Sequence, residues 1–344
     1  MNIQLTILIP VYNEINLIQK FSSNLINTFK NTPTKYIFID DGSTDGTSQW
    51  LKENIKISYN DYQFEILSLN KNYGKGYAIR QGIKRIEGRY TLCIDSDCEY
   101  TPKDALEIYT IIKNNNNIDV LYGSRYLGGK IQYRKHFLND IAVRLNTYIF
   151  NILFDQSITD LHTGTKIIKT SLIKDLRLSL NRFGLEIDMS SQIAKKNCNI
   201  YEYGISYVER TKEQGKKITF FDGLLSYFFL FKMRFLQNDV PTLISIIYSV
   251  IFMFYFGTLI GGSGIINFLT CLFCVAIGLM LGINRKLIPL SFMFVIIYLT
   301  ILFIPEDIKI FSIFITFMLS FFISKKISNK FKFYKKNFIL KYLI

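Results

Sequence analysis

Apolar and polar residues follow two different periods along the first half of this 344-residue chain. Short runs rich in β-branched and aromatic residues precede segments in which apolar residues recur every three or four positions, a pattern that predicts strands alternating with helices. The expected strands are Leu5–Ile9, Tyr36–Ile39, Phe64–Leu69 and Tyr90–Ile94. The expected helices are Glu14–Phe29, Thr44–Asn54 and one that runs through Gln81 to Ile86. Because this order is typical of βαβ units, we predict an α/β domain with a mostly parallel sheet over residues 1–217.

Beyond residue 217 the chain becomes almost wholly apolar. Residues 218–239 begin with many aromatic side chains and few charges, which predicts an amphipathic interfacial helix region. Residues 240–324 contain three apolar runs that carry one charge among them, Lys309. The runs are Val240–Ile283, Leu287–Ile304 and Ile308–Ser324. A spanning helix needs about 20 apolar residues and the first run is long enough for two, so we predict four transmembrane helices.

The formal charge of +14 is concentrated near the C-terminus. Residues 325–344 hold seven Lys and no acidic residue, which predicts a basic cytosolic tail. The N-terminus lacks the pattern of a secretory signal, so the first domain is also expected in the cytosol. We therefore expect an integral membrane protein, in the plasma membrane if the source is prokaryotic. The tail favours anionic lipid over nucleic acid, so no nucleic-acid partner is expected, and a homo-oligomer through the transmembrane helices stays open.

Polar side chains follow three of the expected strands, at the point where each strand ends. Asn13 and Glu14 follow the first, Asp40 and Asp41 follow the second, and the cluster Asp95–Glu99 follows the fourth. In open parallel sheets ligands bind at the carboxyl ends of the strands. We therefore expect these residues to form one site.

The cluster at the end of the fourth strand has the spacing of a metal site. Asp95, Asp97 and Glu99 alternate along the chain, and carboxylates placed in this way can converge on one Mg²⁺ or Mn²⁺ ion. Such an ion would neutralise the charge of a departing nucleotide diphosphate. If this spacing is considered without the other motifs, a solvated acidic turn explains it as well.

Two further segments favour a nucleotide site. The sequence FIDDGSTDGT (Phe38 to Thr47) ends a strand in two acids, and helix capping explains its turn but not Asp40 and Asp41 together. The glycine-rich NKNYGKGYAIRQG (Asn70 to Gly82) offers backbone N–H groups and Lys75 to a diphosphate. It is neither a Walker A loop nor a GxGxxG motif, so neither NTP hydrolysis nor a dinucleotide cofactor is indicated.

These motifs resemble, in order and spacing, those of family 2 glycosyltransferases, specifically the dolichol-phosphate mannose synthase-like branch. The matching segments are IPVYNE, FIDDGSTDGT, NYGKGYA, IDSDCEY, LYGSRYLGG, ITDLHTGTK, RFGLEIDMSSQIAKK and YEYGISYVERTKEQGKKI. The resemblance covers about residues 3–225. It implies a GT-A fold and transfer of one hexose from a GDP- or UDP-linked sugar to a dolichyl or undecaprenyl phosphate.

The resemblance also implies roles for residues on the nucleotide side. Pro10, Tyr12 and Glu14 would border the nucleotide, and Asp41 would lie near the base or ribose. Asp95 and Asp97 would bind the metal and the diphosphate and so act in catalysis. Glu99 stands where such enzymes often carry Gln, which adds negative charge.

On the acceptor side, Arg125 would meet the acceptor phosphate. Ser124 precedes it, and Arg134 would assist it. Arg210, Lys216 and Lys217 would also bind the acceptor phosphate and would lie on a loop that closes over the diphosphate. A cationic surface facing a membrane explains Arg134 and the Lys pair equally well. Thr165 and Asp188 depart from the pattern of the branch, which affects the expected sugar or acceptor but not the reaction.

An acceptor phosphate has a second pKa of about 6, so near neutral pH it is largely a dianion and needs no general base. We therefore expect direct attack with inversion, and a structural role for Asp160. A processive polysaccharide synthase is the nearest alternative, but its QxxRW motif is absent because the sole Trp is Trp50. A non-catalytic membrane scaffold is the second alternative, and it would not retain all these motifs together.

Overall fold

The computed structural model describes residues 3–58, 63–210 and 220–236. The chain divides into two units, Met1–Leu230 and Phe231–Ile344, and the fold below is that of the first. The expected transmembrane region, the basic tail, Lys216 and Lys217 lie outside the described residues, so they stay predictions. Within the described ranges, no helix is both long and apolar enough to cross a membrane.

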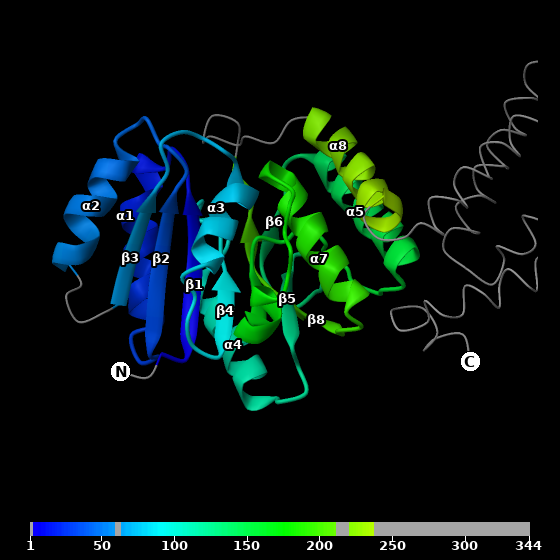
Figure 1. Ribbon diagram of the computed structural model, residues 1–344, viewed down its shortest axis with the longest axis horizontal. Coiled ribbons are helices and arrows are strands. Elements are labelled where there is room, and N and C mark those ends of the chain that lie inside the picture. Colours follow the sequence, from blue (N-terminus) through cyan, green and yellow to red (C-terminus); the bar gives the residue numbers. More distant parts are fainter. Residues whose placement is uncertain (1–2, 59–62, 211–219, 237–344) are drawn as a thin grey trace, which may run out of the picture. The chain divides into compact units, whose positions relative to one another are not determined.

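A seven-stranded sheet forms the centre of the first unit (Figure 1). Its strands lie in the order β3-β2-β1-β4-β7-β5-β8. The pairs are parallel except that β7 runs antiparallel to both β4 and β5, so the mostly parallel sheet is confirmed. The bounds are β1 Leu5–Val11, β2 Thr34–Asp40, β3 Gln63–Ser68, β4 Tyr90–Cys93, β5 Val120–Ser124, β7 Lys166–Lys169 and β8 Ile200–Gly204. A small parallel pair, β6 Gln132–Tyr133 and β9 Tyr207–Val208, lies apart from this sheet.

Helices cover both faces of the sheet. The helices are α1 Ile15–Thr28, α2 Thr47–Ser58, α3 Lys75–Ile83, α4 Pro102–Asn114, α5 Phe137–Phe154, α6 Thr170–Lys174, α7 Leu185–Lys195 and α8 Phe220–Phe231, with a 3₁₀ turn, η1, at Arg182–Gly184. A π turn, η2, at Lys232–Leu236 belongs to the second unit. Successive strand residues face opposite cores, since side chains alternate across a strand. Ile7 packs with Phe21 of α1 and Ile108 of α4, whereas Leu8 packs with Ile79 of α3 and the α7 residues on the other face.

The helices predicted from periodicity are present with shifted ends. Helix α3 begins at Lys75 and ends at Ile83, three residues before the expected end. Helix α8 lies within the expected interfacial region. Its Leu225 and Phe228 are exposed and its Leu230 is buried, so apolar side chains lie on both the outer and the inner side of this helix. Its amphipathic character and its placement at a membrane stay predictions.

Candidate active site

A cleft of about 620 Å³ opens at the carboxyl ends of β1, β2 and β4. It is lined by residues of all the motifs expected on the nucleotide side. These are Pro10, Val11, Tyr12, Glu14, Asp41, Asn72, Gly74, Lys75, Asp95, Ser96, Asp97, Arg182 and Arg210. The structure therefore brings together every residue expected to contact the nucleotide sugar except Asp40.

The adjacent acids Asp40 and Asp41 have different surroundings. Asp41 accepts hydrogen bonds from the backbone N–H groups of Tyr73 and Gly74, at 2.9 and 2.7 Å, and so joins β2 to the glycine-rich turn. Burial raises the pKa of Asp41 despite these bonds. Asp40 is buried and accepts from the Ser43 N–H at 3.1 Å within its own turn. Asp40 therefore shapes the turn and does not line the cleft.

The turn after β2 is also tied to the turn after β1. Ser43 accepts from the Asn13 N–H at 2.9 Å, and the Thr47 hydroxyl accepts from the Glu14 N–H at 3.0 Å. Gly42 has a φ of +71°, and a Cβ there would lie 2.6 Å from the Cα of Lys71. Only glycine allows the turn after β2 to approach the turn after β3 this closely.

Two cations that come from other motifs pair with three cleft carboxylates and with Glu186, which does not line the cleft. The Lys75 amino group lies 2.7 Å from Asp95 and 2.6 Å from Glu186 of α7. The Arg210 guanidinium lies 3.0 Å from Glu14 and 3.5 Å from Asp97. Burial disfavours the charge of Lys75, but these two carboxylates raise its pKa above the ordinary value.

The charge of Asp97 fits a cation site. Burial, together with the nearby Glu99 and Asp95 carboxylates, raises the pKa of Asp97 to about 7. A divalent ion would relieve this concentration of negative charge, and carboxylate oxygens are ligands that Mg²⁺ and Mn²⁺ prefer. Asp95 and Asp97 both line the cleft.

Glu99 points to different partners. Its carboxylate accepts from the Tyr207 hydroxyl at 2.8 Å and from the Arg210 N–H at 2.9 Å. Across the part of the chain that the structure describes, no three His, Cys, Asp or Glu side chains are arranged to hold a metal ion. The expectation that Glu99 is a third ligand of the metal ion therefore stays a prediction. In the structure its carboxylate is hydrogen-bonded to Tyr207 of β9.

Arg125 is held by a buried carboxylate. Its Nε and one terminal nitrogen donate to the two oxygens of Asp160, each at 2.7 Å, and its backbone N–H donates to the same group at 3.0 Å. Burial opposes the charge of Asp160, but Arg125 lowers its pKa below the ordinary range. The backbone N–H of Asp160 donates to Glu202 of β8 at 2.9 Å. This arrangement agrees with a structural role for Asp160.

Two other residues expected at the acceptor phosphate, Arg134 and Ser124, form hydrogen bonds within the segment that carries Arg125. Arg134 donates to the carbonyl oxygen of Arg125, and its guanidinium lies 4.4 Å from the Tyr126 ring centroid. Ser124 is fully buried; its hydroxyl bonds Thr159 at 2.6 Å and accepts from the Tyr126 N–H at 3.0 Å. Ser124 therefore shapes the turn that carries Arg125.

Sequence reasoning missed Glu186, His162 and Lys166. Glu186 pairs with Lys75, as described above. Burial lowers the pKa of His162 to about 4, so the imidazole is neutral near pH 7. Burial lowers the pKa of Lys166 to about 8, and its amino group donates to the carbonyl oxygen of Leu161 at 3.2 Å. Glu186 lies in the matched segment RFGLEIDMSSQIAKK, but nothing in that segment singled it out from Asp188.

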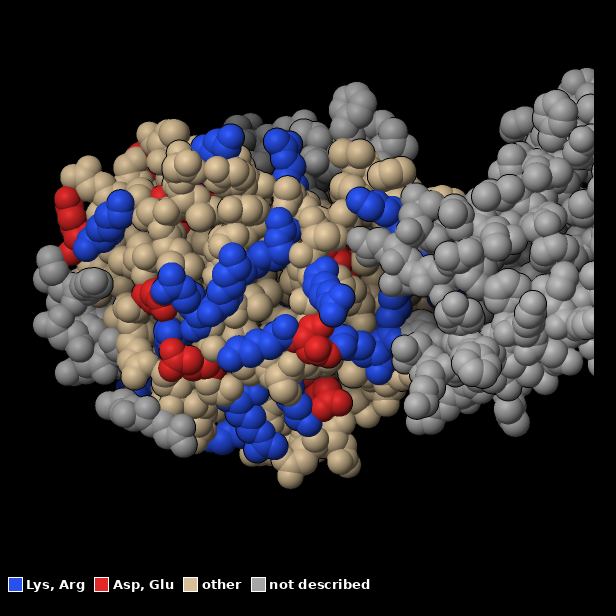
Figure 2. All heavy atoms as spheres, viewed as in Figure 1, with Lys and Arg blue, Asp and Glu red and all other residues tan. Residues whose placement is uncertain are grey.

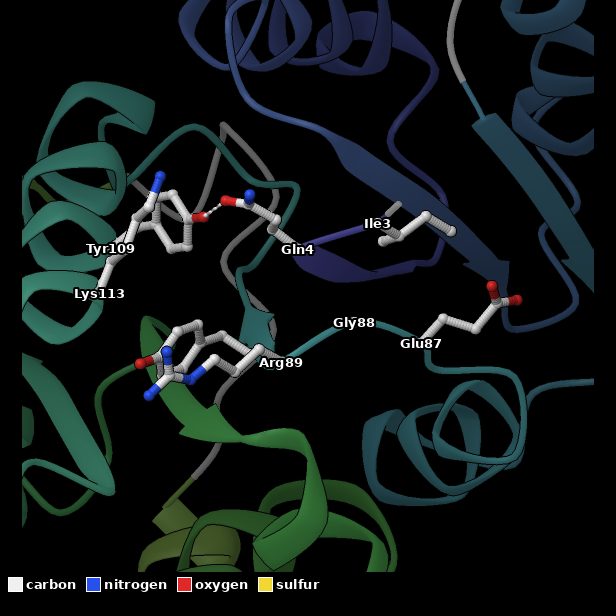
Figure 3. A pocket seen from close by; sticks show the side chains of 8 residues that line it. Ile3, Gln4, Glu87, Gly88, Arg89, Tyr109 and Lys113 are labelled. Atoms are coloured by element: carbon white, nitrogen blue, oxygen red, sulfur yellow. Dashed lines mark hydrogen bonds between the residues drawn. The ribbon is translucent and has the colours of Figure 1, made fainter. Parts of the chain in front are cut away.

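A second hollow, of about 510 Å³, lies at the opposite ends of β1 and β4 (Figure 3). Tyr109 donates to Gln4 across it at 3.3 Å, and Arg89 and Lys113 lie at its rim. This hollow is lined by none of the residues expected to take part in catalysis or binding. Basic side chains also gather across one face of the domain, with fewer acidic ones among them (Figure 2). Neither feature competes with the carboxyl-end cleft as the candidate site.

Comparison with known proteins shows the family of the chain. A family model described as "Glycosyl transferase family 2" matches residues 6–177. Dolichyl-phosphate beta-glucosyltransferase of Saccharomyces cerevisiae is 29% identical over 225 residues, which cover 60% of this chain and 67% of that protein. Dolichol-phosphate mannosyltransferase of Pyrococcus furiosus is 26% identical over 224 residues, which cover 62% of this chain and 60% of that protein.

The fold also resembles that of solved enzymes. Glucosyl-3-phosphoglycerate synthase from Mycobacterium tuberculosis superposes with a TM-score of 0.53 at 15% identity, covering 69% of this chain and 82% of that one. A complex of the same enzyme with Mn²⁺, uridine diphosphate and glucosyl-3-phosphoglycerate superposes with a TM-score of 0.51. This likeness shows the fold, which is the GT-A fold that the motifs implied.

Proposed function

The chain belongs to glycosyltransferase family 2, and from this premise we propose that it transfers one hexose from a GDP- or UDP-linked sugar to a polyprenyl phosphate, with inversion. That it is a nucleotide-sugar glycosyltransferase follows from the family. One observation carries the finer proposal. The carboxyl-end cleft holds Asp95 and Asp97. Tyr207 donates its hydroxyl to Glu99, two residues from Asp97, and its ring centroid lies 5.1 Å from the guanidinium carbon of the largely buried Arg125.

The donor side of the proposal rests on the residues of the cleft. Asp95 and Asp97 would hold Mg²⁺ or Mn²⁺, which when bound would neutralise charge on the diphosphate. The M. tuberculosis enzyme of the same fold was crystallised with Mn²⁺ and uridine diphosphate, which supports an ion of this class. Lys75 and Arg210 would stabilise the negative charge that develops on the leaving group.

The acceptor side of the proposal rests on Arg125 and Arg134. Both relatives described above are named for transfer to dolichyl phosphate, which supports a polyprenyl phosphate acceptor. One phosphate oxygen attacks the anomeric carbon, the bond from that carbon to the nucleotide diphosphate breaks, and its electron pair leaves with the diphosphate. Direct displacement inverts the anomeric carbon. Asp160 is not needed as a base, because its two oxygens bind Arg125 and its pKa is lowered.

The location proposed is a membrane, with the transferase domain in the cytosol. The apolar runs within residues 240–324 and the seven Lys of the tail support this location. The acceptor would then reach the enzyme from the same lipid layer. A homo-oligomer through the apolar segments stays open.

Product analysis tests the proposed function. Membranes that contain the full chain are incubated with Mn²⁺, polyprenyl phosphate and one labelled nucleotide sugar at a time. We expect one sugar per lipid, in a product whose anomeric configuration is opposite to that of the donor. A polymer would identify a processive synthase instead, and the absence of any labelled lipid with every donor would reject the polyprenyl phosphate acceptor.

A further inference from the structure

Three cations line the carboxyl-end cleft: Lys75, Arg182 and Arg210. Lys75 and Arg210 are each paired with at least two carboxylates, as described above. Arg182 is exposed, and with the other residues that the structure describes its side chain forms neither an ion pair nor a hydrogen bond. Its charge is therefore the one among these three that no carboxylate of the described chain opposes.

The backbone of Arg182 has a conformation that residues with a side chain rarely adopt. Its φ is +47°, in the left-handed region. Five non-glycine residues of the described ranges have a positive φ, and three of them are Asn or Asp, which tolerate it best. The other two are Cys98, next to Asp97, and Arg182. Strained residues persist only where the surrounding structure holds them, and they concentrate at ligand sites.

The segment that carries Arg182 is held against the glycine-rich turn. A Cβ at Gly74 would lie 2.5 Å from the Cγ of Arg182, and a Cβ at Gly76 would overlap the carbonyl oxygen of Leu180. Arg80 of α3 donates to the same carbonyl oxygen at 2.7 Å. The two glycines therefore admit the segment and Arg80 fixes it, so that Arg182 stands at one place on the wall of the cleft.

The glycine-rich turn itself offers fewer donors to a diphosphate than its sequence suggests. The backbone N–H groups of Tyr73 and Gly74 donate to Asp41, at 2.9 and 2.7 Å, so these two donors are used within the protein. The guanidinium of Arg182, whose Cγ packs on Gly74, carries N–H donors in a planar fork that matches phosphate oxygens. Arg182 can therefore supply, at this wall of the cleft, contacts that the turn does not.

We propose that Arg182 binds the diphosphate of the nucleotide sugar and stabilises the charge that this group gains as the sugar is transferred. The inference rests on the proposed function, which makes a nucleoside diphosphate the leaving group. When the bond from the anomeric carbon to the diphosphate breaks, its electron pair adds one negative charge to the diphosphate. Because carboxylates already oppose the charges of Lys75 and Arg210, the guanidinium of Arg182 adds most to the binding of this anion.

Nucleotide binding by the full chain tests the proposal. Isothermal titration of the detergent-solubilised protein measures the Kd of UDP and of GDP, each with Mn²⁺. We expect Arg182→Gln to raise the Kd of the nucleotide that the parent protein binds by about tenfold or more. Arg182→Lys keeps the charge without the planar fork and should raise the Kd less. The matched control Arg177→Gln removes an exposed cation that does not line the cleft, and it should change the Kd by less than about twofold.

Three results would overturn the proposal. The first is an unchanged Kd in Arg182→Gln. The second is an equal rise in Arg177→Gln, which would assign the effect to the net charge of the domain. The third is an equal loss of affinity for uridine or guanosine, which have no phosphate, because Arg182 would then contact the nucleoside.

The strained backbone gives a second readout that needs no nucleotide. Arg182→Gly relieves the positive φ, so this variant should unfold at the same temperature as the parent or a few degrees higher, while it binds the nucleotide as weakly as Arg182→Gln does. A lower unfolding temperature together with weak binding would show that Arg182 serves the fold instead. If the parent binds neither UDP nor GDP, the proposed function fails together with this inference. If the parent binds and transfers while Arg182→Gln binds equally well, only this inference fails.

Discussion

Asp160 holds Arg125 by three hydrogen bonds, two to the guanidinium and one to the backbone N–H. The carboxylate is fully buried and Arg125 is nearly so. A bidentate pair of this kind sets both the position and the orientation of the guanidinium. Asp160 therefore acts through Arg125, which it holds ready for an anionic acceptor.

Replacing Asp160 by Asn tests this positioning role. The amide keeps the shape but loses the charge and one acceptor oxygen, so we expect the KM for the acceptor phosphate to rise about tenfold or more, and the KM for the nucleotide sugar to stay nearly constant. The free energy of unfolding should fall by about 3 kcal/mol, because a buried pair is broken. Steady-state kinetics and chemical denaturation measure both. The control Asp175→Asn removes an exposed ion pair with Lys196 and should change neither.

Asp97→Asn should reduce transfer by on the order of 10²-fold or more while the protein stays folded. The reason is the loss of a carboxylate proposed to hold the divalent ion. The rate of lipid-linked sugar formation is measured against added Mn²⁺, with circular dichroism as the test of folding. The control Asp119→Asn alters a surface pair with Lys169 and should retain activity. A fully active Asp97→Asn enzyme would exclude the metal role of this residue.

The stability of the metal-free protein should fall as the pH rises from about 4 to 7 through the titration of Asp97. The pKa of Asp97 is raised to about 7 in the folded protein, so the folded state retains a proton that the unfolded state has released. Stability falls with pH wherever the folded state binds more protons. Thermal unfolding in EDTA should show this decline for the unmodified protein relative to Asp97→Asn. Added Mn²⁺ should reverse it, and parallel curves for the two proteins would refute the assignment.

Glu186→Gln should raise the concentration of Mn²⁺ needed for half-maximal activity. Lys75 divides its charge between Glu186 and Asp95, and without Glu186 it would pair more tightly with Asp95 and compete with the ion. We expect a shift of about three- to tenfold, which corresponds to roughly 1 kcal/mol. Metal titration of activity measures it. The exposed Glu53→Gln serves as control, and an unchanged metal requirement in Glu186→Gln would show that Glu186 does not influence the ion.

Gly164→Ala should impair transfer through steric contact with Asp95. A Cβ at this position would lie 2.8 Å from the carboxyl carbon of Asp95 and 2.8 Å from the ring of Tyr100. Displacing a reacting group by a fraction of an ångström to 1 Å can cost about 10²-fold in rate. Gly128→Ala is the matched control, since a Cβ there would meet nothing within 4 Å. Equal activity of the two variants would contradict the close approach.

Much of the cleft could be predicted from local patterns. Short runs rich in β-branched and aromatic residues located β1, β2 and β4, and the carboxyl ends of parallel strands meet at one edge of a sheet. Tyr12, Asp41 and Asp97 therefore had to lie near one another once the strands were recognised as parallel. The glycine-rich turn before α3 could be placed beside them for the same reason.

Other features depended on contacts between distant segments. The sequence of β7 does not indicate that it inserts antiparallel between β4 and β5. Glu186 meets Lys75 across 111 residues. The motifs suggested that Asp40 and Ser124 contact a ligand. Instead, the Asp40 carboxylate and the Ser124 hydroxyl each accept a hydrogen bond from a backbone N–H of their own turn.

Local patterns in the chain were enough to predict the alternation of strands and helices, the edge of the sheet at which the acids gather, and the family. The pairing of each cation with its carboxylate and the outward apolar side of α5 became known only from the folded structure. Periodicity and motifs are properties of neighbouring residues, whereas pairing and exposure depend on the path of the whole chain. That path results from the burial of two cores on opposite faces of the sheet, which no single segment specifies.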